Sequence, residues 1–364
     1  MLKLLCAAVV SLMLALDPSA ASAREAKSQT VKKVSKAKAQ KAGAGRQRVK
    51  LVQRGAAVKK GKRQIIYTSV RRSAPVFIAM TAGDRAGLNQ TRDALDLGSS
   101  VAFVIDQANN QVLFEKNAGV ALPIASITKL MTGLLVVESG LNLDEMLTIT
   151  DADVDRHKFT SSRLRVGATM TRRDLLHIAL MSSENRAAAA LGRNYPGGIG
   201  AFVAAMNAKA QQLGMTETHY VDSSGLSSQN VASARDLARL AVVAYGEPLL
   251  RQFSTDPKYA VDDGRRTMQY GNTNYLVASP DWNIGLQKTG FINEAGKCLL
   301  MQAVISGRHV IMVFLDSKGR QTRTADAGRV KRWLETLAPS TTAAAPPASM
   351  YRPASGPQGV TQGG

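Results

Sequence analysis

The stretch Pro-Ile-Ala-Ser-Ile-Thr-Lys-Leu-Met-Thr, residues 123–132, predicts the start of a buried helix. From this stretch onward, apolar residues recur at the helical spacing i, i+3, i+4, i+7 and i+8, at Ile127, Leu130, Met131, Leu134 and Leu135. Pro123 fits this reading, because proline is common where a chain turns into a helix. Ser126 and Lys129 are three residues apart, so one turn of helix brings their side chains together.

This pair has a chemical meaning as well as a structural one. A serine hydroxyl is a weak nucleophile at neutral pH and needs a neighbouring base to take its proton. A lysine enclosed by aliphatic side chains can be that base, because desolvation lowers its pKa. The plain alternative is a capping serine beside an ordinary lysine. The chain also contains a second Ser-x-x-Lys, residues 35–38, in a stretch that has no apolar face at all, so the motif can occur by chance. The motif therefore needs support from the rest of the chain.

The first 23 residues have the pattern of a secretory signal peptide. Lys3 is a short basic start, Leu4 to Leu16 form the apolar core, and Ala21 to Ala23 form a small-residue cleavage site. We therefore expect an exported protein cleaved near Ala23. The remainder has a single cysteine, Cys298, which we expect to be a buried apolar side chain, and no other apolar run long enough for a transmembrane helix.

A strongly basic arm follows the signal peptide. Residues 24–72 contain 17 Lys and Arg against one acid, Glu25, which is +16 of the chain's formal charge of +20. Few of these residues are large and apolar, so we expect a disordered polycation that binds anionic envelope polymers, or else a solubilising tail. Nucleic acid is a poor partner, because the arm has no interleaved aromatic residues. Residues 339–364, rich in Pro and Ala, are expected to be a disordered tail.

The segment 73–338 is the expected catalytic domain, with 28 basic and 25 acidic residues. Strand-like runs at 101–106 and 111–115 are joined by a hairpin signal, and strands return at 282–286, 298–305 and 309–315 before a final helix that carries Val330, Trp333, Leu334 and Leu337. The middle of the chain has helical patterns, one behind the capping pair Thr171 and Asp174, one ending at Gly214 and one over 234–245. This order predicts an α+β domain, with one antiparallel sheet formed by both chain ends and a helical lobe opposite.

Two further motifs follow Ser126 in the chain. Ser183-Glu-Asn185 lies between two helical patterns, where a hydroxyl and an amide could relay a proton and hold a carbonyl. Lys288-Thr289-Gly290 lies in a strand-like context, where its cation and hydroxyl suit a substrate carboxylate and its glycine lets another backbone approach. Each motif alone would more often be a plain turn. The three motifs together, in this order, are far more specific evidence of a catalytic site than any one of them.

The ordered motifs Ser-x-x-Lys, Ser-x-Asn and Lys-Thr-Gly resemble those of the penicillin-binding and serine β-lactamase superfamily. Over residues 90–337 the likeness extends to further stretches, which resemble the D-alanyl-D-alanine endopeptidases of the penicillin-binding protein 7 type, in the S11 group of serine peptidases. They are 123–132, 161–167, 179–188, 195–198, 205–210 and 285–298. The resemblance implies a β-lactamase/D,D-peptidase-like fold, peptidoglycan peptides as substrate, β-lactams as covalent inhibitors and a periplasmic location.

The resemblance also implies a role for each matching residue. Ser126 would be the acylated nucleophile and Lys129 its base, while Ser183 would pass a proton to the leaving amine and Asn185 would hold the substrate backbone. Lys288 and Thr289 of the Lys-Thr-Gly290 motif would bind the substrate carboxylate. The backbone N–H groups of Ser126 and Phe291 would form the oxyanion hole. No metal or cofactor is implied, and the acidic run Asp151, Asp153 and Asp155 lacks the glycine and glutamate that a calcium loop needs.

Several functions remain open from the sequence. The first is an endopeptidase that cuts D-Ala–diaminopimelate cross-links, and the second is a carboxypeptidase that removes the terminal D-Ala with the same residues. A β-lactamase is a weaker hypothesis, because no downstream glutamate matches the deacylation loop of class A enzymes. A non-catalytic wall-binding protein is disfavoured because all three motifs are intact.

Overall fold

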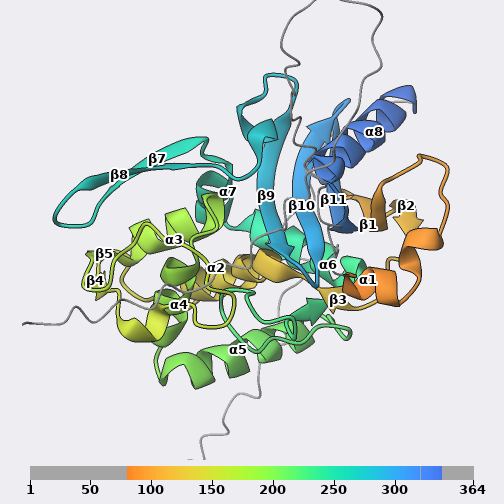
Figure 1. Cartoon of the computed structure of the whole chain (residues 1–364). Coiled ribbons are helices and arrows are strands. Elements are labelled where there is room, and N and C mark those ends of the chain that lie inside the picture. Colours follow the sequence, from red (N-terminus) through yellow and green to blue (C-terminus); the bar gives the residue numbers. More distant parts are fainter. Residues whose placement is uncertain (1–79, 320, 338–364) are drawn as a thin grey trace, which may run out of the picture. The chain divides into compact units, whose positions relative to one another are not determined.

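The computed structural model of the 364-residue chain describes residues 80–319 and 321–337, the coloured part of Figure 1. The predicted signal peptide, the basic arm 24–72 and the tail 339–364 lie outside the described residues. The domain boundaries expected at 73 and 338 therefore stay predictions. Within the described ranges, no helix combines the length and the apolar character needed to cross a bilayer.

One five-stranded sheet, in the order β2-β1-β11-β10-β9, is antiparallel throughout. Its strands are β1 Ser99–Asp106, β2 Val112–Lys116, β9 Asn283–Ile292, β10 Gly296–Ile305 and β11 Arg308–Ser317. The first two strands come from the start of the domain and the other three from its end, and they lie side by side (Figure 1). The predicted α+β architecture, with a sheet formed by both chain ends, is confirmed.

Strands β1, β10 and β11 are buried on both faces of this sheet, which explains why they read as largely apolar runs. Along β1, Val101 and Phe103 enter the core shared with the helical lobe, whereas Ala102 and Val104 enter a second core on the other face. The second core is closed by helix α8, Thr322–Thr336, through Val330 and Leu334. Successive residues of a strand point to opposite faces, so one strand serves both cores.

A single buried carboxylate ties α8 to the start of β1. Asp326 accepts hydrogen bonds from the backbone N–H of Gly98 at 3.0 Å and of Ser99 at 2.8 Å, and from the Ser99 hydroxyl at 2.6 Å. Arg329, one turn further along α8, donates to the same side chain at 2.7 Å. Hydrogen bonds to a charged group are the stronger ones, so this contact helps to hold the two chain ends together.

The residues between β2 and β9 form the helical lobe. Its helices are α2 Thr128–Glu138, α3 Arg172–Met181, α4 Asn185–Arg193, α5 Gly198–Gln212, α6 Ala234–Gly246 and α7 Pro248–Thr255. The hydroxyl of Thr171 accepts from the Asp174 N–H at 3.0 Å, and that of Ser233 accepts from the Asp236 N–H at 3.1 Å. Both serve as N-caps, of which the sequence analysis names Thr171, and each fixes where its helix begins.

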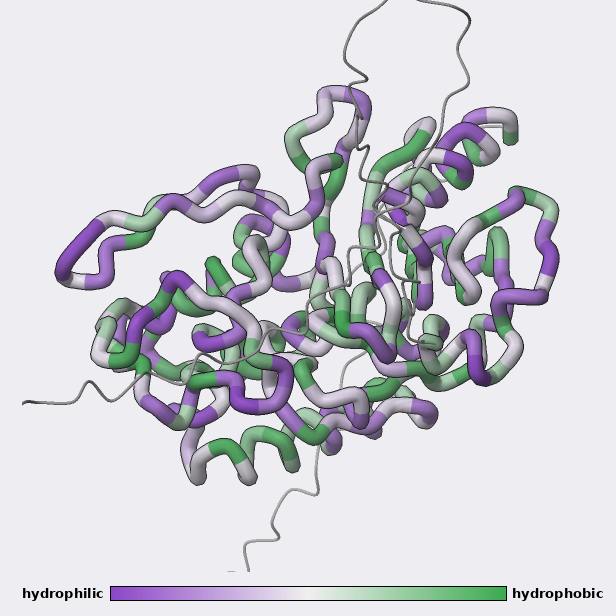
Figure 2. Tube along the Cα trace, viewed as in Figure 1, coloured by the Kyte–Doolittle hydropathy of each residue, from purple (hydrophilic) through white to green (hydrophobic). Residues whose placement is uncertain are grey.

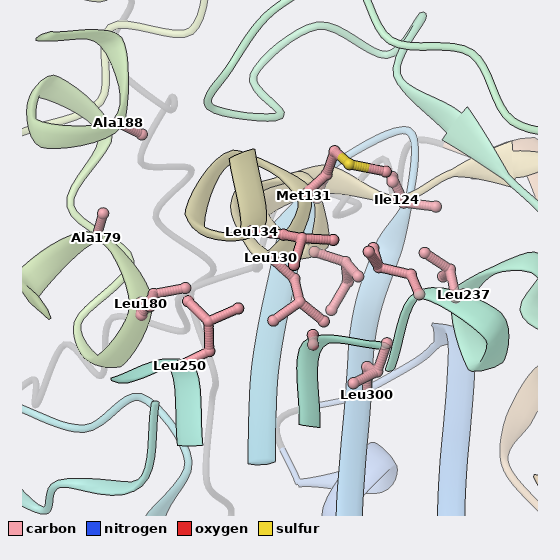
Figure 3. Packing of buried hydrophobic residues seen from close by; sticks show 14 of the residues in the cluster. Ile124, Leu130, Met131, Leu134, Ala179, Leu180, Ala188, Leu237, Leu250 and Leu300 are labelled. Carbon is pink, nitrogen blue, oxygen red and sulfur yellow. The ribbon is translucent and has the colours of Figure 1, made fainter. Parts of the chain in front are cut away.

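Helix α2 lies at the centre of the lobe and is buried on all sides. Every residue from Thr128 to Val136 is buried, so the single apolar face expected from the sequence understates its burial. Figure 3 shows Leu130, Met131 and Leu134 among side chains from other elements, including Leu180 of α3, Leu250 of α7 and Leu300 of β10. An ordinary side chain at Gly133 would touch Leu250 at 3.0 Å, so this glycine lets α7 approach closely.

The sequence reading misses several elements. The shorter ones are α1 Ala82–Arg85, β3 Leu122–Pro123 with β6 Val231–Ala232, β4 Met146–Thr148 with β5 Thr169–Thr171, and the 3-10 turns Leu88–Gln90, Ala125–Ile127, Asp151–Asp153 and Tyr275–Ala278. The hairpin of β7, Lys258–Asp262, and β8, Thr267–Gly271, is larger and has a hydrophilic tip (Figure 2). Strand β9 also continues six residues past the predicted end at 286, so the Lys-Thr-Gly motif lies within it.

Candidate active site

Ser126 and Lys129 occupy a 3-10 turn and the first α-helical turn that follows it. The 3-10 turn, Ala125–Ile127, runs directly into α2 at Thr128. The amine of Lys129 lies 2.8 Å from the hydroxyl oxygen of Ser126, so the structure brings together the two residues that the spacing pairs. Lys129 is fully buried, whereas Ser126 is partly exposed.

Lys129 has two further partners, and both are oxygens that can only accept. Its amine lies 2.7 Å from Asn185 Oδ1 and 2.5 Å from the backbone carbonyl of Ser224. A neutral amine has two N–H donors and one lone pair. If the two donors serve Asn185 and Ser224, the lone pair is left to face the Ser126 hydroxyl. This arrangement suits removal of the serine proton.

The orientation of Asn185 is fixed by a chain of hydrogen bonds from the loop before α3. The hydroxyl of Thr160 donates to Asp155 at 2.8 Å, so its oxygen is free to accept from Asn185 Nδ2 at 3.0 Å. That contact turns Asn185 Oδ1 toward Lys129. Backbone N–H groups hold the Asp155 carboxylate, and these hydrogen bonds lower its pKa to about 2 even though burial acts in the opposite direction.

Burial is the main cause of the unusual pKa of Lys129. Removal of the amine from water lowers its pKa from 10.5 to about 7, against the opposing charges of Asp222 and Glu184. A lysine with this pKa is partly neutral near neutral pH. It can therefore accept a proton, which an ordinary lysine cannot do there.

The loop that supplies the Ser224 carbonyl is held by Asp222. Its carboxylate accepts from the N–H groups of Ser224 at 2.7 Å, Gly225 at 2.6 Å and Ser227 at 2.9 Å. Gly225 has a φ of +81° and lies directly against the turn that carries Ser126. A Cβ at this position would fall 1.9 Å from the carbonyl oxygen of Ala125.

Strand β9 places the Lys-Thr-Gly motif on the other side of the same turn. A Cβ on Gly290 would lie 2.8 Å from the Ile124 carbonyl oxygen and 3.2 Å from the backbone nitrogen of Ser126. Only a glycine allows so close an approach. On α8, Arg323 donates to the carbonyls of Gly290 at 2.8 Å and Cys298 at 3.1 Å, which holds this part of the strand from behind.

The two other motif residues, Lys288 and Thr289, and the following Phe291 differ in exposure. Lys288 is fully buried and donates to the carbonyl of Thr289 at 2.9 Å; burial, and then the charge of Lys129, keeps its pKa well below the usual range. The Thr289 hydroxyl lies 2.6 Å from that of Thr273. Phe291 is exposed, with the Lys297 amine over its ring. Lys288 and Thr289 are thus both buried, and Phe291 is the exposed residue of this part of the strand.

Ser183 lies in the turn between α3 and α4, as predicted, and has a φ of +61°. It lines a hollow of about 300 Å³ together with Asn185. Lys129 contacts Ser126, Asn185 and the Ser224 carbonyl, and Ser183 is not among these partners within the described residues. The structure thus brings Ser126, Lys129 and Asn185 together and packs Gly290 against them. It places Ser183 beside Asn185.

Sequence reasoning missed the residues that support these contacts. They are Asp155, Thr160, Asp222, Gly225, Thr273 and Arg323. Asp222-Ser-Ser-Gly225 has the composition of a tight turn, which is a detectable signal. Its position against Ser126 is not, because that contact spans about a hundred residues of chain.

Comparison with known proteins agrees with the resemblance. The sequence pattern of the peptidase S11 family, described as D-alanyl-D-alanine carboxypeptidase, matches residues 88–319. A D-alanyl-D-alanine endopeptidase of Pseudomonas aeruginosa is 50% identical over 266 residues, 72% of this chain and 85% of the relative. One of Escherichia coli is 42% identical over 265 residues, 72% of this chain and 84% of the relative.

Solved structures with similar folds include a DD-transpeptidase and a penicillin-binding protein. The crystal structure of the Streptomyces K15 DD-transpeptidase is similar with a TM-score of 0.63 at 28% identity, over 68% of this chain and all of that one. The penicillin-binding protein D2 of Listeria monocytogenes, in a cefotaxime-bound form, is similar with a TM-score of 0.59 at 31% identity, over 66% of this chain and 98% of that one. These likenesses confirm the predicted fold class.

The lowered pKa of Lys129 predicts how acylation by a labelled penicillin depends on pH. Lys129 must be neutral to take the proton, so the second-order rate constant should rise as pH increases through about 7 and then level off. Lys129→Arg should lose at least about 100-fold in rate at every pH, because a guanidinium keeps its proton. A flat profile across the neutral range would show that another group is the base.

The contact of Gly225 predicts a second outcome. Gly225→Ala should reduce acylation severely and lower the melting temperature, because the new methyl group displaces the Ala125 carbonyl and with it Ser126. Gly264→Ala is the matched control, since Gly264 has a φ of +82° and a Cβ added there would have nothing within 4 Å. Both variants bear the cost of a left-handed backbone, about 1 kcal/mol. Equal acylation by the two variants would contradict the packing argument.

Proposed function

This chain belongs to the peptidase S11 family of D-alanyl-D-alanine carboxypeptidases, and we propose that it is a serine D,D-endopeptidase that hydrolyses D-Ala–diaminopimelate cross-links in peptidoglycan through an acyl-enzyme. The observation that carries the proposal is the contact of Lys129 with Ser126, in which two accepting oxygens occupy the other positions around the amine. Two relatives with substantial identity are named endopeptidases, which supports this specificity.

In the proposed first step, Ser126 Oγ attacks the carbonyl carbon of D-Ala while its proton passes to Lys129. Negative charge develops on the carbonyl oxygen, and the backbone N–H groups of Ser126 and Phe291 would stabilise it, at about 3–4 kcal/mol for each donor. The close approach of Gly290 to the Ser126 nitrogen supports this pairing, because it holds the two backbone segments against each other.

The amide bond then breaks and the leaving amine takes up the proton, which Ser183 would deliver from Lys129. An ester between D-Ala and Ser126 remains. Water attacks the ester in the second step, with Lys129 as the base, and the proton returns to Ser126 Oγ. Asn185 would hold the substrate backbone, and Thr289 with Lys288 would hold the carboxylate beside the leaving nitrogen.

A D,D-carboxypeptidase is the second candidate, because the family carries that description and the chemistry is the same. The two activities differ only in the leaving group, which is free D-Ala in one case and a whole stem peptide in the other. We further propose that the protein is exported to the periplasm and is acylated by β-lactams. The cefotaxime-bound form of the similar Listeria protein supports the second point.

Digestion of purified cross-linked muropeptide dimers tests the proposed activity. The wild-type protein should convert dimers into monomers, and mass spectrometry should show addition of one water for each bond cut. Ser126→Ala should abolish both the cleavage and the single penicillin adduct. If monomeric pentapeptides lose D-Ala while dimers stay intact, the carboxypeptidase reading replaces the endopeptidase one.

The charge of the arm supports a separate proposal, that residues 24–72 bind anionic polymers of the cell envelope. Removal of residues 24–72 should leave the rate on soluble dimers unchanged but weaken pelleting with isolated sacculi. Pelleting of the longer form should fall steeply toward physiological salt, where the Debye length is about 8 Å. If both forms pellet equally at every salt concentration, the arm is a spacer or a solubilising segment.

A further inference from the structure

A polar hollow of about 300 Å³ borders the candidate active site, and apart from Ser183 and Asn185 its lining residues have no part in the bond-making chemistry described above. We call it the serine hollow. Its walls come from the loop with Ser161 and Arg163, from the turn with Ser183 and Glu184, and from Tyr270 of β8. Its volume is at the lower end for ligand sites and is generous for a single alanine.

In the mechanism proposed above, the serine hollow lies on the side of the leaving group. Ser183, the proposed proton donor to the leaving amine, forms part of its wall. Thr289, which would bind the carboxylate next to that amine, touches Thr273 at 2.6 Å. Thr273 also donates from its backbone N–H to the carbonyl of Met181 at 3.0 Å, directly before the Ser183 turn. A chain of contacts thus joins Thr289 of β9, the proposed carboxylate-binding residue, to the wall of the hollow.

The lining suits the polar groups of a peptide. Among the residues that the structure describes, the side-chain hydroxyls of Ser161, Ser182 and Ser183 have no hydrogen-bond partner, which leaves them available to a ligand. Glu184 is buried and accepts from Ser162 through one carboxylate oxygen at 2.7 Å. The hollow therefore offers hydroxyl groups and a carboxylate to amide N–H groups.

Arg163 supplies the one cation of this lining. Its guanidinium carbon lies 4.9 Å from the centre of the Tyr270 ring, and the guanidinium also donates to the carbonyl of Gln269. These two contacts hold an exposed side chain in place beside the hollow. An arginine fixed in this way can bind a carboxylate with two parallel hydrogen bonds, and a stem peptide ends in a carboxylate.

We propose that the serine hollow binds the leaving stem peptide of a cross-link and that Arg163 is a specificity-determining residue that favours cross-linked over single-stem substrates. This inference rests on the proposed endopeptidase function and deepens it. A single-stem substrate has only D-Ala on the leaving side, and its one carboxylate is the one assigned to Thr289 and Lys288. A cross-linked substrate continues into the hollow and gains the contact.

Binding measured without cleavage tests the proposal. In the Ser126→Ala background, calorimetry would compare a cross-linked tetrapeptide dimer with a monomeric pentapeptide. Arg163→Leu should weaken dimer binding about tenfold or more, the size expected for one hydrogen bond between charged groups, and should change monomer binding by less than about twofold. Arg163→Lys should recover part of the dimer affinity.

Arg332→Leu is the matched control, since Arg332 is an exposed arginine on α8. Melting temperatures of all variants would establish that each one folds. Equal dimer affinity in Arg163→Leu and Arg332→Leu, or equal losses on dimer and monomer, would overturn the inference. Failure of the wild-type protein to cut dimers would instead refute the endopeptidase function, because the calorimetry does not depend on cleavage.

Discussion

An amine surrounded by hydrocarbon and backbone loses the water that stabilises its charge, and the candidate site depends on this loss at Lys129. Complete burial brings the pKa of Lys129 to about 7, although Asp222 and Glu184 both oppose the shift. The lysine lies on α2, the helix that the whole lobe encloses (Figure 3). The packing of the lobe is therefore a chemical requirement as well as a source of stability. A looser core would admit water, and the pKa of Lys129 would return toward its ordinary value.

Two carboxylates place the partners of this lysine without touching it. Asp222 fixes the loop that presents the Ser224 carbonyl, and Asp155, through Thr160, fixes the direction of the Asn185 amide. Asp222 has two opposing effects, since the charge that organises its loop also favours the protonated lysine. A pKa near 7 reflects this balance. The site keeps the base usable at neutral pH while its geometry remains fixed by strong hydrogen bonds.

The sequence predicts what is local and periodic, and it misses what depends on contacts across the chain. The apolar runs of β1 and α2 and the caps Thr171 and Ser233 all carry short-range signals, and all are present in the structure. The β7–β8 hairpin was missed although Asp263-Gly264 is a turn signal, because each strand has only five residues and neither contains a sustained apolar run. The motif residues could be selected from the sequence, whereas their orientation could not, because it depends on partners such as Thr160 and Ser224, 25 and 95 residues away.

The strands and the helix from the end of the domain also help to position the active-site residues. The turn that carries Ser126 has a left-handed residue, Ala125, with a φ of +48°, and two glycines from distant parts of the chain pack against this turn. Gly225 comes from the helical lobe, and Gly290 comes from β9, which Arg323 of α8 holds in place. Backbone packed on backbone leaves no room for adjustment, so the position of Ser126 follows the positions of both glycines. The final helix and the edge strand therefore help to determine where the nucleophile lies, and they are part of the active-site construction even where they supply no reacting group.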